Sequence, residues 1–300
     1  MAKQNQERSA QAKAAQMREA ERKRAQRTRL LIAGGVVLTV LALIAVLVVV
    51  GVLSNNDSAS PTASGSASTA QAASEQILKD ISSVPQSTFD AVGVGTAALF
   101  PSKASPPGTP SSDKPLVLYY GAEFCPFCAA ERWPAAVALS RFGTWNNLGV
   151  TTSSATDQFP STSTLSFHGA TLTSSTLTFH GYETTTNQPL AGGGGYEPLD
   201  TVPAADQQII TGLNPSGQIP FMSFDAQYQQ SGASYSPQIL AGMTQEEIAA
   251  ALADPKNPIS QAIVGSANVL TAAICATTNQ QPANVCNSSG VRAGAAKLGS

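Results

Sequence analysis

Residues 116–133, with the sequence LVLYYGAEFCPFCAAERW, decide the fold. The stretch opens with a short apolar and aromatic run, residues 116–120, which is typical of a buried strand. A short connection leads to the C-x-x-C motif of Cys125 and Cys128, and the residues after it are mostly compatible with a helix. We therefore expect a strand followed by a helix that begins at the motif, with both sulfur atoms on one side of its first turn.

The start of a helix favours a thiolate at Cys125. Backbone N–H groups lack partners there and the helix dipole is positive, so such positions lower a cysteine pKa from about 8.5 into the range of about 3.5–7.5. Pro126 suits the first turn, because its missing N–H would have been unpaired in any case. We predict a redox-active pair, and a purely structural disulfide is the alternative. We predict no metal site, because Cys275 and Cys286 do not form a second C-x-x-C motif.

Charge is distributed very unevenly along the 300 residues. Nine of the 17 Lys and Arg residues fall in residues 1–29 with three acidic residues, whereas the rest of the chain has eight basic and 16 acidic residues. This pattern argues against a nucleic-acid-binding protein, because the basic charge lies on a separate tail and the main body is acidic. Four cysteines in 300 residues also argue against a disulfide-dense miniprotein.

An uncharged apolar segment follows the basic tail at residues 30–53. As a helix it would be roughly 36 Å long, enough to cross a hydrocarbon core of about 30 Å. A cleaved signal peptide is the alternative, but its apolar region is normally only about 7–15 residues long. We predict a retained transmembrane helix, with residues 1–29 in the cytoplasm because positive residues favour that side.

A linker and a globular domain come after this helix. Residues 54–74 are small and polar, which is typical of a flexible tether. Helical spacing of apolar residues begins near Glu75. We predict an extracytoplasmic domain at residues 75–300 of a single-pass protein of the cell membrane.

Two segments of the chain resemble the thioredoxin superfamily. Residues 122–128 after an apolar strand are similar to its active-site segment, and Trp133-Pro134 fits the kinked helix that follows it. The sequence GQIPFMSF at 217–224 is similar to the segment that carries the superfamily's cis-proline. The resemblance implies an α/β fold, a thioredoxin-like sheet flanked by helices. It also implies that Pro220 is cis and faces the cysteines, and that the backbone of Ile219 contacts a substrate strand.

Four stretches resemble a more specific family. This is a domain-of-unknown-function family of membrane-anchored thioredoxin-like proteins of archaea and actinobacteria. The stretches are GAEFCPFCAAERW (121–133), SGASYSP (231–237), LAGMTQEEIAAAL (240–252) and ICATTNQQPANVC (274–286). With the apolar segment, the resemblance covers roughly residues 30–290.

The chain departs from the superfamily at two positions. Thioredoxins and related oxidases often carry a buried carboxylate six residues before the first cysteine, where this chain has Tyr119. No histidine lies inside the motif, where strong oxidases often have one. Glu123 is the nearest candidate for proton transfer, and the direction of electron flow is left open.

The segment between the cysteines and Pro220 is about twice as long as a minimal thioredoxin core needs, so we predict a β-rich insertion at about residues 151–210. The sequence TLSFHG at 164–169 recurs as TLTFHG at 176–181, which predicts two strands in a hairpin or meander. The repeat places His168 and His180 before glycines, and we interpret both as exposed turn residues rather than metal ligands.

The C-terminal part of the domain is predicted to be mainly helical. A strand at 221–224 continues into an edge hairpin, and the capping-box pattern of Thr244 and Glu247 opens a helix. A second helix covers roughly residues 259–276. Cys275 and Cys286 are expected to form a local structural disulfide outside the membrane.

These features predict a membrane-anchored, extracytoplasmic thiol–disulfide oxidoreductase that needs no cofactor. Cys125 and Cys128 are the predicted catalytic residues, with Cys125 forming a mixed disulfide that Cys128 resolves. The predicted partners are protein thiols or disulfides and a membrane redox partner, and no nucleic acid. The alternative is a non-catalytic thioredoxin-like module that binds another envelope protein and contains only structural disulfides.

Overall fold

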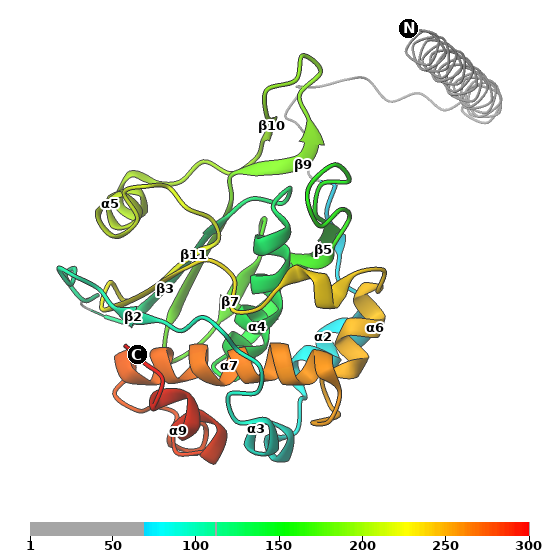
Figure 1. Cartoon of the computed structure of the whole chain (residues 1–300). Helices are drawn as coiled ribbons and strands as arrows, with labels where there is room; N and C mark the ends of the chain where they lie inside the picture. Colours follow the sequence, from blue (N-terminus) through cyan, green and yellow to red (C-terminus); the bar gives the residue numbers. More distant parts are fainter. Residues whose placement is uncertain (1–68, 112, 300) are drawn as a thin grey trace, which may run out of the picture. The chain divides into compact units, whose positions relative to one another are not determined.

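The computed structural model describes residues 69–111 and 113–299 (Figure 1). The predicted cytoplasmic tail, the predicted transmembrane helix at 30–53 and most of the predicted linker lie outside these residues. The described part is a mixed α/β structure of sheets and helices, in agreement with the predicted fold class at that level.

The strands and helices of the described part have the following bounds. The strands are β1 (Gln71–Ala72), β2 (Ser102–Lys103), β3 (Leu116–Gly121), β4 (Thr144–Asn146), β5 (Gly149–Thr152), β6 (Ser163–Ser166), β7 (Thr171–Thr173), β8 (Thr178–Glu183), β9 (Thr185–Pro189), β10 (Tyr196–Pro198), β11 (Phe221–Phe224) and β12 (Tyr228–Ser231). The helices are α2 (Glu75–Ser82), α3 (Gln86–Val92), α4 (Pro126–Ser140), α5 (Ala204–Leu213), α6 (Gln245–Ala251), α7 (Pro258–Thr277), α8 (Ala283–Cys286) and α9 (Ser289–Ala295), with a 3-10 turn η1 (Pro237–Leu240).

The central sheet has the strand order β2-β12-β11-β3-β8. β3 is parallel to β8 and antiparallel to β11, and β12 turns back antiparallel to β11. Val117, Leu118 and Tyr119 in β3 are fully buried. A continuous apolar run is typical of a strand that is covered on both faces, and the strand predicted at 116–120 is confirmed.

Helices cover both faces of this sheet, with α5 on one side of β3 and β11 and with α4 and α7 on the other (Figure 1). Successive side chains of a strand point to opposite faces. Val117 and Tyr119 therefore join the main core with α4 and α7, whereas Leu118 packs with Ile210 of α5. Two parallel strands must be joined by a long crossover connection. Here the crossover leaves β3, runs through α4 and returns to the same sheet at β8.

The repeated sequence does not form the predicted hairpin or meander. β6 pairs with β5 in a separate small sheet, whereas β8 is parallel to β3 in the central sheet. The segment at about 151–210 is therefore not simply an insertion, because it supplies one strand of the central sheet. The prediction was wrong because the local alternation of polar and apolar residues predicts strands but not their partners.

Two further boundaries differ from the predictions. β12 is not an edge strand, because β2 pairs with Tyr228 and Gln229. The ordered domain also begins before Glu75, because Gln71 and Ala72 pair with β5. Both differences come from strands of two residues, which are too short to produce a recognisable pattern in the sequence.

Helix α7 is the central helix of the domain and confirms the helix predicted at about 259–276. Among the described residues it is the one helix long and apolar enough to span a membrane. It is almost completely buried against α3, α4 and α9. Burial on all sides accounts for its apolar composition.

The predicted features at the C-terminal end of the domain are present. Thr244 and Glu247 form both hydrogen bonds of the capping box at the start of α6. Cys275 at the end of α7 and Cys286 at the end of α8 are at disulfide distance, with the sulfur atoms 1.96 Å apart.

The close approach of α7 to the segment after α3 generates a test of the packing. A Cβ atom on Gly265 would lie 2.5 Å from the carbonyl oxygen of Val94, so the backbone would have to shift. We expect Gly265→Ala to lower the free energy of unfolding by about 1–3 kcal/mol, measured as a shift of the urea midpoint. The matched control is Gly212→Ala on α5, where a Cβ atom meets nothing within 4 Å. The control should be neutral or stabilising by up to about 1 kcal/mol, and equal effects of the two substitutions would contradict the packing.

Candidate functional site

The cysteine pair lies where β3 ends and α4 begins, as predicted. Cys125 is the N-cap residue of α4, and its Sγ accepts the backbone N–H of Cys128 at 3.4 Å. Cys125 is 6% exposed, whereas Cys128 is fully buried, and both are free thiols. Pro126 is the first residue of the helix. A small part of Cys125 is therefore open to solvent, whereas Cys128 is fully shielded from it.

The two thiols have opposite tendencies to ionise. A hydrogen bond from the Cys128 side chain lowers the pKa of Cys125 to about 7, with smaller contributions from backbone N–H groups of the first turn and from Arg132. Burial opposes this shift at Cys125, and it raises the pKa of Cys128 well above its ordinary value. The arrangement provides one slightly exposed thiol that ionises readily and one fully buried thiol that keeps its proton.

The segment before β11 reaches the same end of the sheet. Phe221 pairs with Tyr120, so Pro220 lies beside the end of β3 from which the cysteine loop departs. The bond between Ile219 and Pro220 is cis. Pro220 is buried and Ile219 is half-buried. No hydrogen bond joins the backbone of Ile219 to another of the described residues.

Glu131 connects α4 to the loop that holds Pro220 in place. Its carboxylate accepts the backbone N–H of Ser234 at 2.7 Å, the hydroxyl of Ser234 at 3.0 Å and the side-chain amide of Gln230 at 2.8 Å. In the same loop, the N–H of Gly232 donates to the carbonyl of Pro220 at 2.8 Å. Glu131 is fully buried, and burial raises its pKa to about 7.

Arg132 and Glu183 form a buried ion pair beside the cysteine loop. Arg132 Nε and Nη2 donate to the two carboxylate oxygens of Glu183 at 2.7 and 2.6 Å. Arg132 Nη2 also donates to the carbonyl of Ala122 at 2.6 Å, and the N–H of Cys125 donates to the same carbonyl at 3.3 Å. Both charged side chains are fully buried. Sequence reasoning missed this pair, although two adjacent charged residues in an otherwise apolar helix are a usable signal.

Glu123 and Tyr119 are the other buried polar residues near the motif. Glu123 Oε1 accepts the hydroxyl of Ser166 at 2.8 Å, and the carboxylate is fully buried. The Tyr119 hydroxyl is buried without a hydrogen-bond partner among the described residues, and burial raises the pKa of Tyr119. The position six residues before Cys125 is thus filled by a phenol, which its raised pKa keeps neutral.

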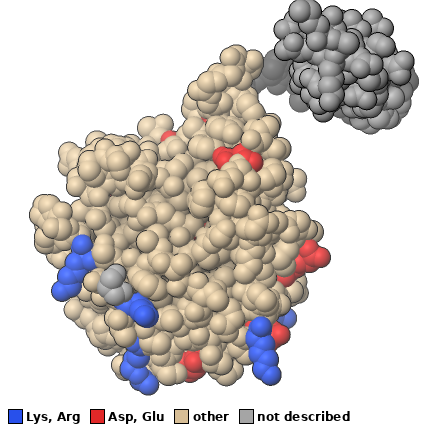
Figure 2. Space-filling view, in the orientation of Figure 1, with Lys and Arg blue, Asp and Glu red and all other residues tan. Residues whose placement is uncertain are grey.

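An aromatic surface made of Phe124, Phe127, Phe159 and Tyr196 adjoins the motif. The rings of Phe124 and Tyr196 stack with centroids 4.2 Å apart, and the rings of Phe127 and Phe159 meet edge to face at 5.7 Å. Phe127 lies inside the motif and is 39% exposed. No Lys or Arg occurs between Arg141 and Lys256. In Figure 2 the visible Lys and Arg side chains lie on the half of the domain away from β9 and β10.

His168 lies in a turn, as the repeat predicted, whereas His180 lies in a strand, and their side chains are 37% and 41% exposed. His180 lies in β8, where its Nδ1 is 2.6 Å from Asp206, and His168 Nδ1 is 2.7 Å from Asp200. Tyr182 also donates to Asp206 at 2.6 Å. These contacts attach the loops and α5 to the sheet. Among the described residues, no group of three or more His, Cys, Asp or Glu side chains is placed to hold a metal ion.

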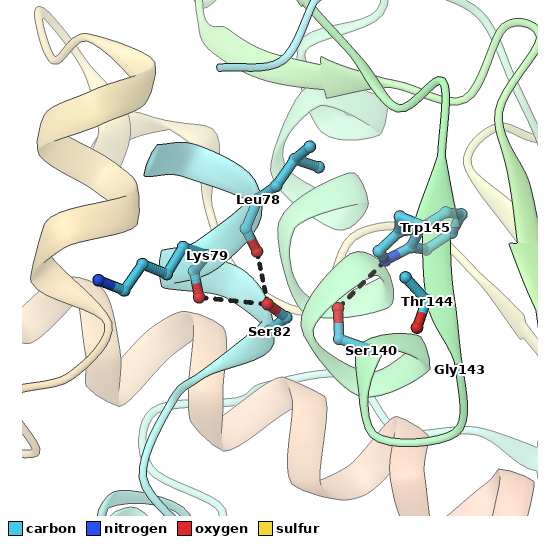
Figure 3. A pocket seen from close by; sticks show the side chains of 7 residues that line it. All are labelled: Leu78, Lys79, Ser82, Ser140, Gly143, Thr144 and Trp145. Atoms are coloured by element: carbon cyan, nitrogen blue, oxygen red, sulfur yellow. Dashed lines mark hydrogen bonds between the residues drawn. The ribbon is translucent and has the colours of Figure 1, made fainter. Parts of the chain in front are cut away.

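A cavity of about 400 Å³ lies between α2 and the C-terminal end of α4 (Figure 3). It is lined by Leu78, Lys79, Ser82, Ser140, Gly143, Thr144 and Trp145. Its polar groups partly bond to one another, as in the hydrogen bond from Trp145 to Ser140 at 3.1 Å. Since α4 rises about 1.5 Å per residue, Ser140 is roughly 20 Å from the cysteines. This cavity is therefore separate from the C-x-x-C motif.

Comparison with known proteins gives one match. Residues 101–216 match the model of a family described as Domain of unknown function (DUF929). The matched part contains β3, both motif cysteines, Arg132 and Glu183, and it ends before Pro220. The match supports the predicted resemblance to a domain-of-unknown-function family. No curated protein and no solved structure matches this chain.

The raised pKa of Glu131 predicts a pH-dependent stability. Its ordinary pKa is 4.5 and its folded value is about 7, so the folded protein binds this proton more tightly than the unfolded chain. The free energy of unfolding must therefore fall as pH rises between these two values, by up to about 3 kcal/mol. We expect Glu131→Gln to remove this dependence, measured by urea unfolding at about pH 5 and at about pH 8.

The control for this experiment is Glu246→Gln, which changes an exposed carboxylate on α6. Its stability difference from the wild type should be the same at both pH values. A constant difference between Glu131→Gln and the wild type would contradict the burial of Glu131 as an ionisable group.

Proposed function

We propose that this protein is a thioredoxin-like thiol–disulfide oxidoreductase, anchored in the cell membrane and active outside the cytoplasm. The observation that carries the proposal is the paired free thiols at the start of α4, of which Cys125 is accessible with a pKa of about 7 and Cys128 is buried. A structural disulfide requires neither an ionised outer thiol nor an opening to solvent. The anchor and the orientation rest on the sequence of residues 1–53 alone.

The topology supports the thioredoxin-like part of the proposal. The strand order β12-β11-β3-β8, with β3 parallel to β8 and antiparallel to β11, resembles the central sheet of that superfamily. The helix that carries the motif and α7 cover one face, and α5 covers the other. The cis Pro220 beside the end of β3 occupies the place that the resemblance implies.

The exchange reaction uses only the two cysteines of the motif. The Cys125 thiolate attacks one sulfur of a substrate disulfide, forms a mixed disulfide and releases the other sulfur as a thiolate that takes up a proton. Cys128 then loses its proton and attacks Cys125, which releases the second substrate thiol. The substrate gains two electrons, and the pair of Cys125 and Cys128 is oxidised. Glu123, the buried carboxylate beside the motif, is the proposed acceptor of the Cys128 proton.

The pKa of Cys125 favours a reductant or an isomerase over a strong oxidant. A low pKa at the attacking thiol stabilises the reduced form, and the strong oxidant DsbA has a value of about 3.5 whereas thioredoxin has about 7. The value of about 7 for Cys125 corresponds to the second type. Continued turnover then requires a donor of electrons, and a membrane redox partner is the one that the anchor favours.

The proposed substrate is an extended polypeptide that carries a disulfide. Phe127 of the aromatic surface lies inside the motif, and Ile219 precedes the cis Pro220 with backbone groups that bond to none of the described residues. These backbone groups are able to pair with a substrate strand, as in the superfamily. The aromatic rings favour apolar side chains next to the substrate cysteine. The lack of Lys and Arg between residues 141 and 256 agrees with a substrate that is not selected by negative charge.

The first test compares the two motif cysteines in disulfide exchange. We expect Cys125→Ser to reduce the rate of insulin disulfide reduction to background, because the attacking thiolate is gone. Cys128→Ser should still attack and should accumulate a mixed disulfide with the substrate, detected by non-reducing electrophoresis.

The matched control replaces both Cys275 and Cys286 by serine. Loss of a disulfide that closes a loop of 11 residues should lower stability by about 3 kcal/mol without removing exchange activity. If the folded wild type does not reduce insulin and Cys128→Ser traps no partner, the non-catalytic binding module is the correct description.

A second test addresses the proposed proton acceptor. We expect Glu123→Gln to slow the release of product from the mixed disulfide about tenfold or more, because the buried Cys128 proton loses its acceptor. Formation of the mixed disulfide should keep its wild-type rate. Both steps are followed by stopped-flow fluorescence with a labelled peptide disulfide, and Ser166→Ala serves as a control that keeps the carboxylate. Equal slowing of both steps would exclude a specific role of Glu123 in proton transfer.

A further inference from the structure

The buried ion pair of Arg132 and Glu183 takes no step in the exchange reaction described above, beyond the small contribution of Arg132 to the lowered pKa of Cys125. A fully buried ion pair is a weak source of stability, because the loss of hydration offsets much of the attraction between its charges. Its location beside a pair of reactive thiols therefore raises the question of what the positive charge does there.

The backbone geometry connects Arg132 to both cysteines. Arg132 follows Cys128 by four residues in α4, so the two side chains lie on the same face of the helix. Arg132 Nη2 and the N–H of Cys125 donate to the same carbonyl, that of Ala122. The guanidinium group is therefore fixed between the end of β3 and the first turn of α4, on the inner side of the motif.

Arg132 has one donor that the ion pair does not use. Its Nη1 is buried and has no hydrogen-bond partner among the described residues, whereas Nε and Nη2 are both engaged. An unpartnered buried donor is costly in a folded protein. A donor of this kind gains an acceptor when a neighbouring group becomes negatively charged.

Among the described residues, Arg132 is the positively charged group that acts on both motif cysteines. Cys128 interacts electrostatically with Cys125, with Arg132 of α4, with Glu183 of β8 and with Tyr119 of β3. The cysteine, glutamate and tyrosine side chains among them are neutral with their protons and negative without them, whereas Arg132 stays positive. Burial and the neighbouring Cys125 raise the pKa of Cys128, and Arg132 is the group that lowers it.

We propose that Arg132, held in place by Glu183, is a positioning residue that stabilises the thiolate of Cys128 while it resolves the mixed disulfide. This inference rests on the proposed function and assigns a further residue to it. In the step concerned, Cys128 gives up its proton, forms a bond to the sulfur of Cys125 and displaces the substrate sulfur, which leaves as a thiol after taking up a proton. Cys128 carries a negative charge only after it loses its proton and before it bonds to Cys125. During this interval the positive charge of Arg132 stabilises the thiolate.

The test uses the full-length reduced chain in detergent and an aromatic disulfide reagent, dithiobis(nitrobenzoate). Attack by Cys125 releases a first coloured thiolate, and attack by Cys128 on the resulting mixed disulfide releases a second one. The two phases report the two thiols separately, and their rates are measured as a function of pH. The variants are Arg132→Lys, Glu183→Gln, and the double variant Arg132→Met with Glu183→Gln.

The double variant replaces the pair by neutral side chains, which removes the positive charge without leaving a buried unpaired carboxylate. We expect its second phase to be about tenfold slower at neutral pH, because a pKa higher by about one unit lowers the thiolate fraction about tenfold. The midpoint of its pH profile should move to higher pH. Arg132→Lys keeps the charge and should stay within about threefold of the wild type.

Glu183→Gln gives a result of opposite sign and does not depend on the folding of the double variant. It removes a negative charge near Cys128 and keeps Arg132, so the second phase should become faster and its midpoint should move to lower pH. The matched control is Arg141→Gln at the far end of α4, which should leave both phases unchanged. Folding of each variant is checked by circular dichroism.

Unchanged second phases in the folded double variant, or in Glu183→Gln, would show that the ion pair is only structural. The reagent reacts with the cysteines whether or not a protein substrate exists. A wild type with two normal phases and no insulin reduction would therefore contradict the proposed function, whereas altered phases in the variants would still support the role of Arg132.

Discussion

The burial of helix α4 is the constraint on which the rest of the structure depends. Every residue from Cys128 to Leu139 is buried, so the two charged side chains of this stretch must find partners inside the protein. Glu131 finds them in the loop after β12, and Arg132 finds its partner at the end of β8. Because β12 and β8 lie on opposite sides of β3 in the central sheet, these contacts attach the helix to both halves of the sheet and fix the position of its first turn.

The same burial separates the two thiols chemically. The first turn of α4 is the only part of the helix that reaches the surface near the motif, and the outer thiol at the N-cap receives hydrogen bonds that favour its thiolate. The inner thiol, three residues further on, lies in the core and keeps its proton. Tyr119 of β3 is buried and neutral, so it brings no charge to this site. The charged groups that act on this site are therefore Arg132 of α4, Glu183 of β8 and Glu123 in the loop before the motif.

The sequence predicts those parts of this arrangement that depend on local patterns. The apolar run of β3, the helix at the C-x-x-C motif, the capping box of α6 and the long apolar helix α7 are all present. Pairings between distant segments could not be derived in this way. The repeat at 164–169 and 176–181 correctly indicated strands, but a pattern of period two does not specify whether a strand pairs with its neighbour or with β3. The partner of Arg132 was missed for the same reason, since Glu183 is 51 residues away.

We propose that Cys125 and Cys128 exchange electrons with other thiols and do not form a permanent cross-link. The most direct measurement is the reduction potential of this pair, obtained from the fraction oxidised in glutathione buffers of defined composition. We expect a potential above about −300 mV, near the value of about −270 mV of thioredoxin, in the range where disulfides exchange with the surrounding thiol pool. A potential below about −300 mV, which is typical of structural disulfides in secreted proteins, would contradict it.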